Sequence, residues 1–176
     1  MPTKANLKRA PAKALPGGLK PSEILTRLLK LQNRLMAPFS IHVEKRHKIS
    51  LNEFRMLMSI GRLGVSASHE LVEQTGINAM GVSRAIGELR RHGRVVVDVD
   101  PANRRRKTIH LTAKGQTLYE QMLPTTEKVA DYLFEALRPD EIMAFDHFVS
   151  TLTAQLEATD EQGRSQFLER TRPTDS

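Results

Sequence analysis

Cysteine is absent from this chain of 176 residues, and so is tryptophan. Without thiols the chain cannot form a disulfide, a cysteine nucleophile, a thiol redox sensor or a cysteine-ligated zinc site. Two tyrosines and six phenylalanines supply few rings, so the core must consist mainly of Leu, Ile, Val and Met. No apolar run approaches the roughly 20 residues that a membrane span requires. We expect no membrane partner and, because the basic N-terminus lacks the apolar segment of a secretory signal, a cytoplasmic location.

Catalytic and metal-binding patterns are missing from the sequence as well. It has no Ser/His/Asp spacing, carboxylate pair, phosphate-binding glycine loop or metal-ligand motif, so we expect neither an enzyme nor a cofactor. His42 and His47 invite a metal interpretation, but they are five residues apart, which places them poorly on one helical face. Lys45 and Arg46 between them would repel a cation. We therefore expect these histidines to lie on a polar surface or to line a pocket.

The positive charge of the chain is concentrated in two regions. The net charge is +7, and residues 1–20 contain five basic and no acidic residues. Residues 84–107 contain eight basic and three acidic residues, whereas residues 108–176 contain six basic and twelve acidic ones. A surface that binds nucleic acid requires such clustering. A solvated basic surface without a partner is the alternative, and it is disfavoured because the second region coincides with a helix-turn-helix pattern.

Residues 50–112 carry the pattern around which the chain is organised. Ser50 and Glu53 form a capping box, in which the hydroxyl and the carboxylate each bind a free N–H group at the start of a helix. The expected helices run from Ser50 to Gly64, from near Ser66 or Ser68 to Thr75-Gly76, and from Ala79 to His92 with Asn78 as its cap. A third helix in this arrangement presents its first turns to the major groove of DNA.

A two-stranded hairpin follows the third helix. The β-branched run 95–99 and the alternating segment 107–111 predict its strands, and Arg104 to Lys107 lie at the tip. Four consecutive cations repel one another, so nearby phosphates would stabilise them, and an arginine can enter the narrow minor groove. Pairing of Asp98 and Asp100 with part of the cluster is an alternative that does not exclude DNA binding.

The remaining segments flank this unit. Residues 1–20 are expected to be a disordered basic arm, which either contacts phosphates or only solubilises the chain. A helix is expected over residues 22–48, kinked or broken near Pro38, and two helices over 113–158, the first kinked at Pro124 and ending near Leu137. Residues 159–176 are expected to be a frayed polar tail. The apolar surplus of these helices predicts a two-fold homodimer, which would bind two half-sites of a pseudopalindrome.

The sequence resembles the multiple antibiotic resistance regulator (MarR) family over roughly residues 22–156, within an expected domain at 21–158. The matching motifs are Glu70-Leu71, Thr75-Gly76, Val82-Ser83-Arg84, Leu89, Gly93, the tip Asp100-Pro101-Ala102-Asn103-Arg104-Arg105, and Leu111-Thr112 with Gly115. The resemblance implies a mainly α dimer with a winged helix-turn-helix at 50–112, a small two-stranded wing, and a helical dimerisation region formed by 22–48 and 113–158. It also implies a repressor that a small, often phenolic or aromatic acidic ligand releases from DNA.

Three positions depart from the family pattern. Asn103 replaces the acid that usually braces the wing arginine, here Arg105, although Asp100 can substitute for it. Arg94 replaces an apolar residue after the glycine, which predicts a more exposed start of the strand. Val97 occupies a position that is often arginine. These departures concern details of the wing and leave the expectation of DNA binding intact.

The expected contacts to double-stranded DNA fall into three groups. The third helix contributes the groove-facing residues Asn78, Ala79, Met80, Ser83 and Arg84. Arg84 can contact guanine through two hydrogen bonds, with a phosphate contact or an ion pair to Glu88 as alternatives. The wing contributes Arg105 to the minor groove and Arg104, Arg106 and Lys107 to phosphates, and the start of the second helix contributes Ser66, Ser68 and His69 as phosphate anchors.

The family's ligand pocket lies between the dimer helices and the DNA-binding part. In this sequence that junction would be lined by Phe39, His42, Arg46, Asn52, Arg55 and Met58. A cation beside apolar and aromatic side chains suits an aromatic carboxylate, whereas ordinary packing residues are the alternative. The rival to a ligand-released regulator is an architectural, nucleoid-type protein that binds DNA without sequence preference.

Overall fold

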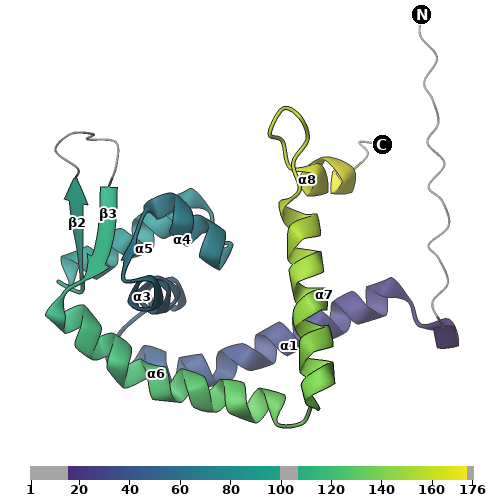
Figure 1. Ribbon diagram of the computed structural model, residues 1–176, viewed down its shortest axis with the longest axis horizontal. Coiled ribbons are helices and arrows are strands. Elements are labelled where there is room, and N and C mark those ends of the chain that lie inside the picture. Colours follow the sequence, from purple (N-terminus) through teal and green to yellow (C-terminus); the bar gives the residue numbers. More distant parts are fainter. Residues whose placement is uncertain (1–15, 100–106, 174–176) are drawn as a thin grey trace, which may run out of the picture. The chain divides into compact units, whose positions relative to one another are not determined.

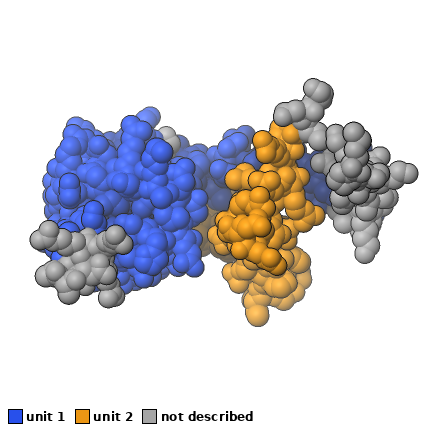
Figure 2. Space-filling view, turned by 90° about the horizontal axis from the view of Figure 1, so that it is seen from above, with its two compact units in different colours: residues 1–123 blue, residues 124–176 orange. Residues whose placement is uncertain are grey.

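The computed structural model of the protein describes residues 16–99 and 107–173 and is mainly helical (Figure 1). Its elements are the single turn η1 (Pro16–Gly18), α1 (Pro21–Phe39), the π-helical turn η2 (Ser40–Glu44), α2 (Lys45–His47), α3 (Leu51–Leu63), β1 (Val65–Ser66), α4 (Ser68–Thr75), α5 (Ala79–Arg91), β2 (Val95–Val99), β3 (Lys107–Leu111), α6 (Ala113–Phe134), α7 (Pro139–Glu157) and α8 (Gln166–Thr171). The chain divides into two compact units, 1–123 and 124–176 (Figure 2). Within the described ranges, no helix combines the length and apolar character needed to cross a membrane.

The first predicted helix is divided into α1, η2 and α2, which together cover residues 21–47. Pro38 lies inside α1, and the hydrogen-bond pattern changes only after Phe39, where the π-helical turn begins. Proline has no N–H to donate and disturbs the helical ladder around it, so the interruption predicted near this residue takes the form of a widened turn. The helical segment ends at Lys48, which adopts the left-handed conformation with a φ of 48°.

The capping box predicted for α3 is confirmed. The Ser50 N–H donates to Glu53 Oε2 at 2.9 Å, and the Glu53 N–H donates to Ser50 Oγ at 3.3 Å. Gly64 ends the helix with a φ of 80°, as predicted. The core of unit 1 lies between α3, α4, α5 and the sheet, and its fully buried side chains include Met56, Leu57, Ile60, Leu71, Val82, Leu89, Val95 and Ile109.

The sheet contains three strands, whereas the sequence predicted a two-stranded wing. Its order is β1-β3-β2, and both pairings are antiparallel. Val65 lies opposite His110, and Val95 lies opposite Leu111. The extra strand β1 has only two residues, and it holds the Ser66 side chain inside the protein at 1% exposure. Figure 1 shows β2 and β3 side by side, next to α5.

Close backbone contacts fix the base of the wing. Gly93 turns the chain with a φ of 66°, and the Arg94 N–H donates to the Leu89 carbonyl at 2.8 Å. The Thr112 N–H donates to the Arg94 carbonyl at 3.0 Å, and the Thr112 hydroxyl caps α6 by accepting from the Gly115 N–H at 3.0 Å. A Cβ on Gly115 would lie 1.9 Å from the Arg94 carbonyl oxygen, so only glycine fits there.

Arg94 is mostly buried, so the prediction of an exposed strand start was wrong. Its side chain is 11% exposed, and its Nη1 lies 3.7 Å from Oε1 of the buried Glu53. Its Nη2 donates to the His47 carbonyl at 3.1 Å, and His92 lies 3.9 Å from the same Glu53 oxygen. The guanidinium is drawn inward because a buried carboxylate is costly without a cationic neighbour. This set of contacts connects α2, α3 and the wing.

Unit 2 shows more order than the sequence predicted. Pro139 opens α7, and the Arg138 N–H donates to Glu141 Oε2 at 2.9 Å, as expected for a helix start with nearby acids. The expected frayed tail is wrong for its described part, which contains α8. Asp160 organises the preceding turn by accepting hydrogen bonds from the Gln162 and Arg164 N–H groups and from the Arg164 side chain.

Replacing Arg94 is expected to destabilise the protein strongly. Arg94→Met leaves Glu53 buried without its cationic neighbour and should lower the free energy of unfolding by about 3–5 kcal/mol in denaturant titrations at neutral pH. The double variant Glu53→Gln/Arg94→Met should recover part of this loss, because the amide oxygen can still accept from the Ser50 N–H.

The matched control is Arg90→Met on the exposed side of α5. It removes the same charge and should change the free energy of unfolding by less than about 0.5 kcal/mol. Equal effects of the two methionine variants would contradict a structural role for the Glu53–Arg94 pair.

Candidate nucleic-acid interface

The α4–turn–α5 segment presents one face of α5 to solvent. Gly76 ends α4 with a φ of 64°, and the Thr75 hydroxyl donates to the Leu71 carbonyl at 2.6 Å and accepts from the Ile77 N–H at 3.3 Å. These contacts set the turn between the helices. The opposite face of α5 is fixed in the core by Val82, Ala85, Ile86 and Leu89.

Four groove-facing candidates are exposed along α5, the first of them Ala79. Met80 is 82% exposed, and Ser83 and Arg84 are exposed one turn later. Gly87 is exposed as well, and its spacing from Met80 and Arg84 places the three on one helical face. Residues 79 and 83 lie beside this stripe, so the helix offers a continuous open surface from its first turn.

Asn78 caps α5, as predicted, which engages part of its side chain. Its Oδ1 accepts from the Gly81 N–H at 2.8 Å. A Cβ on Gly81 would lie 2.7 Å from Ile77 Cγ2, so glycine allows this tight first turn. The carboxamide oxygen of Asn78 is therefore committed to the cap, and only its NH₂ group remains to donate to a ligand.

Arg84 has no ion pair within residues 16–99 and 107–173. Glu88, the alternative partner considered for it, instead accepts hydrogen bonds from Nε of Arg91 at 3.0 Å and from its Nη2. The hydrogen bond from Arg91 holds the pKa of the Glu88 carboxyl below its usual value. The guanidinium of Arg84 therefore remains available for a ligand.

The start of α4 contains two accessible candidates and one that is not accessible. Ser68 and His69 are exposed in the first turn, where the Ala67 N–H donates to Glu70 Oε2 at 2.6 Å. Ser66 lies in β1 with its hydroxyl buried, so its prediction as a phosphate anchor was wrong. The reason is the short pairing with β3, which turns this side chain inward.

The wing provides one described cation. Lys107 is exposed at the start of β3, whereas the predicted contacts Arg104, Arg105 and Arg106 lie outside the described residues. Asp98 lies 3.3 Å from His110 Nδ1 on the neighbouring strand, and the pairing considered for it with the cluster at the tip falls outside the described residues. This carboxylate thus contacts the middle of the hairpin.

Gly87 is the residue of this face that the sequence reasoning missed. It has no positive φ, and nothing lies within 4 Å of a Cβ built on it. Glycine in a helix interior costs roughly 0.5–1 kcal/mol relative to alanine, and the fold of unit 1 gives no reason for it. The signal in the sequence was a glycine seven residues after Met80 and three after Arg84.

The predicted effector residues differ in accessibility. Phe39 is buried, with its ring centroid 5.0 Å from that of Phe54, so it lies on the core side of the predicted site. Met58 packs against the same core, and Arg55 is partly buried. The other members, His42, Arg46 and Asn52, are exposed. No group of three His, Cys, Asp or Glu side chains in the described part of the chain could hold a metal ion.

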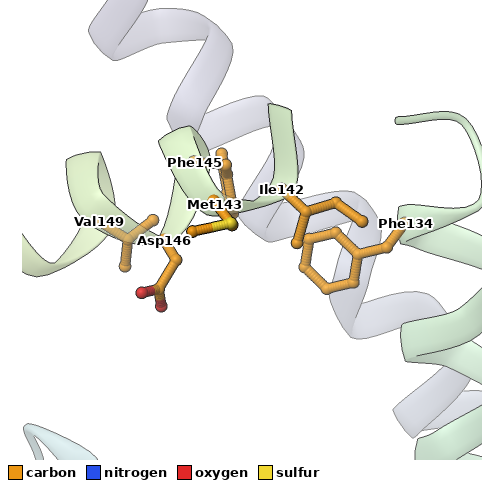
Figure 3. Close-up of a pocket in the computed structure, with 6 residues that line it drawn as sticks. All are labelled: Phe134, Ile142, Met143, Phe145, Asp146 and Val149. Carbon is orange, nitrogen blue, oxygen red and sulfur yellow. The ribbon is translucent and has the colours of Figure 1, made fainter. Parts of the chain in front are cut away.

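A separate apolar pocket lies within unit 2. It is lined by Phe134, Ile142, Met143, Phe145, Asp146 and Val149 (Figure 3). The rings of Phe134 and Phe145 meet edge to face with their centroids 6.0 Å apart. Met143 is 75% exposed, so part of this pocket wall lies open at the surface of α7.

Comparison with known proteins gives matches among solved structures. No family model matches the sequence, and no curated protein matches it significantly. The BpsR protein of Bordetella bronchiseptica, whose DNA binding is regulated by 6-hydroxynicotinic acid, is 25% identical with a TM-score of 0.65, covering 74% of this chain and 98% of its own. NadR in complex with 4-hydroxyphenylacetate is 22% identical with a TM-score of 0.66, covering 78% and 97%. A mutant of Escherichia coli MarR bound to operator DNA is 18% identical with a TM-score of 0.60, covering 74% and 91%.

The helices α3 to α5 and the sheet β1-β3-β2 together define a winged helix-turn-helix protein. More specifically, the chain has the fold of the MarR regulators, which confirms the resemblance seen in the sequence.

Gly87→Ala is expected to stabilise the free protein and to weaken its binding to DNA. Alanine has the higher helix propensity and its methyl group enters open space, so the free energy of unfolding should rise by roughly 0.5–1 kcal/mol. The same methyl group lies on the face of Met80 and Arg84, where it would hold α5 away from the groove. Denaturant titration and binding to a labelled duplex measure the two effects.

Gly81→Ala is the control for the stability measurement. The added Cβ would collide with Ile77, so this variant should have a lower free energy of unfolding. Unchanged or tighter DNA binding by Gly87→Ala would show that DNA does not approach this part of α5.

Proposed function

We propose that the protein is a sequence-specific, DNA-binding transcriptional regulator that acts as a homodimer. It represses from a pseudopalindromic operator and is released by a small aromatic carboxylic or phenolic ligand. The observation that carries this proposal is the open face of α5, where Ser83 and Arg84 are exposed on a helix whose opposite side is locked into the core. A helix presented in this way can enter a major groove.

The expected DNA contacts divide by their chemistry. Arg84 donates two hydrogen bonds to guanine, and Ser83 bonds a neighbouring base edge or phosphate. Ser68, His69 and Lys107 are exposed and contact phosphates together with Arg104 and Arg106. Arg105 enters the minor groove, where the narrow walls concentrate negative potential. Ala79, Met80 and the NH₂ group of Asn78 complete the surface.

Two helices support the proposal of a dimer. In unit 1, α1 exposes Ile24, Leu25, Leu28 and Leu29 at 44–55%. In unit 2, α7 exposes Met143, Phe148, Val149, Leu152 and Leu156 at 43–75%, next to the apolar pocket. Contiguous apolar surface of this kind marks an interaction site, and a second copy of the chain covers both faces.

Charge placed on these faces should dissociate the dimer. Leu28→Glu and Leu152→Glu each bury a carboxylate in the interface and should shift the sedimentation coefficient of the protein from that of a dimer to that of a monomer. Operator binding should weaken in parallel, because each half-site is then bound alone. Ala154→Glu, at an exposed position two residues after Leu152 and so on another side of α7, is the control for added charge. A monomeric unmodified protein would contradict the dimer.

The proposed effector site combines cations with apolar groups at the junction of the first helices with α3. Arg46 and His42 are exposed there, Arg55 is partly buried, and Asn52 offers an amide. Phe39 and Met58 supply the apolar base from the core side. Such a site binds the carboxylate of an aromatic acid through paired hydrogen bonds, while its ring packs on the apolar groups.

The proposal is tested by binding to the DNA upstream of the protein's own gene, at near-physiological salt, with and without a panel of aromatic acids. The expected result is a preference of roughly 10³-fold or more over random DNA that one acid abolishes. Selective binding that no acid affects would overturn the effector site alone. Unselective binding with a steep salt dependence would support the architectural alternative, to which the basic residues 1–20 would contribute.

Arg105→Ala is expected to weaken operator binding by roughly 1–3 kcal/mol. The loss arises because the minor-groove contact disappears, and fluorescence anisotropy at fixed salt measures it. Arg172→Ala removes the same charge from an exposed position after α8 and should leave the affinity almost unchanged. Equal affinities of the Arg105 variant and the unmodified protein would remove the wing from the binding mechanism.

A further inference from the structure

Met80 is the most exposed large apolar side chain in the described part of the chain, at 82%. The exposed apolar residues of α1 and α7 form runs on long helices, but Met80 stands apart from them in the first turn of α5. Its neighbours Ala79 and Gly81 carry no long side chain that could cover it. The fold of unit 1 therefore gives no reason for an apolar group at this position.

The backbone that carries Met80 is held tightly. Asn78 Oδ1 accepts the Gly81 N–H at 2.8 Å, and the Val82 N–H donates to the Asn78 carbonyl at 3.0 Å. Val82, two residues further on, is buried in the core. The thioether thus extends from a fixed turn, and only its own side-chain torsions remain free. A flexible and polarisable side chain on a rigid base suits a contact with a small apolar group.

In a DNA complex, few apolar groups are available for Met80 to contact. In the major groove, base edges present hydrogen-bond donors and acceptors together with one apolar group, the C5-methyl of thymine. We propose that Met80 contacts a thymine C5-methyl and thereby determines one position of the operator half-site. This inference rests on the proposed function as a DNA-binding regulator and assigns a specificity to one residue of it.

The position of that thymine follows from the helix geometry. Met80 and Arg84 are four residues apart on one face, a separation of about one helical turn, or roughly 5.4 Å along the axis. Base pairs are spaced by about 3.4 Å. The thymine therefore lies one or two base pairs from the pair that Arg84 contacts. Because a dimer carries two copies of α5, the contact occurs once in each half-site.

The test uses an operator obtained by selecting bound duplexes from random DNA with the full-length protein. Each thymine is replaced in turn by uracil, which removes the methyl group and preserves base pairing. Burying one methyl group is worth about 0.8 kcal/mol, so the uracil replacement at the contacted position should weaken binding about fourfold in one half-site and about 15-fold in both. Met80→Ala should bind the thymine operator more weakly and lose this sensitivity.

Two variants keep the test specific. Met80→Leu retains an apolar side chain and should preserve part of the thymine preference, whereas Glu73→Ala on exposed α4 should retain all of it. Because Met80 is exposed, the alanine variant should keep the thermal unfolding midpoint of the unmodified protein. Weaker DNA binding by Met80→Ala would then result from the lost contact with DNA and not from unfolding of the protein.

The outcomes separate this inference from the proposed function. Selective operator binding without sensitivity to uracil at any position would overturn the role of Met80 and leave the regulator intact. Equal uracil sensitivity in the unmodified protein and in Met80→Ala would assign the methyl contact to another residue and also overturn it. Failure to select any operator would overturn the proposed function and the inference together.

Discussion

The winged helix-turn-helix unit depends on one buried carboxylate. Glu53 completes the cap of α3 through the Ser50 N–H and, with its other oxygen, faces Arg94 at the start of the wing. Arg94 in turn donates to the carbonyl of His47, at the end of α2. Burial is the main cause that lowers the pKa of His47, followed by the charges of Arg46 and Arg94. The segment before α3, the helix itself and the wing are thus held by a single set of polar contacts.

This arrangement explains how the chain can offer a face of α5 that contributes nothing to its own packing. The core fixes the inner side of the helix, and the capped first turn fixes its start. Packing therefore does not determine the residue types of Met80, Arg84 and Gly87, and each is unusual for stability alone. They are an exposed apolar group, a cation that has no ion pair among the described residues, and a glycine inside a helix. Such departures from local rules are expected at functional sites.

Local signals allowed much of the fold to be predicted. The Ser50–Glu53 capping box, the Gly76 turn and the Asn78 cap depend on residues a few positions apart, and all three are present. The pairing of Arg94 with Glu53 spans 41 positions, and β1 exists only because β3 lies beside it, so neither could be read from a local pattern. In the candidate site, helical periodicity predicted the exposure of Ser83 and Arg84. The burial of Ser66 could not be predicted in this way, because it depends on the pairing of β1 with β3.

If two copies of α5 bind the two halves of one operator, the protein must cover the duplex symmetrically. Hydroxyl-radical footprinting of the full-length protein on a selected operator measures this, because it reports where the protein lies on each strand. We expect two symmetric protected segments whose centres are about one helical turn, or 10 base pairs, apart. Uniform protection along the duplex, or a single protected segment without symmetry, would contradict this expectation.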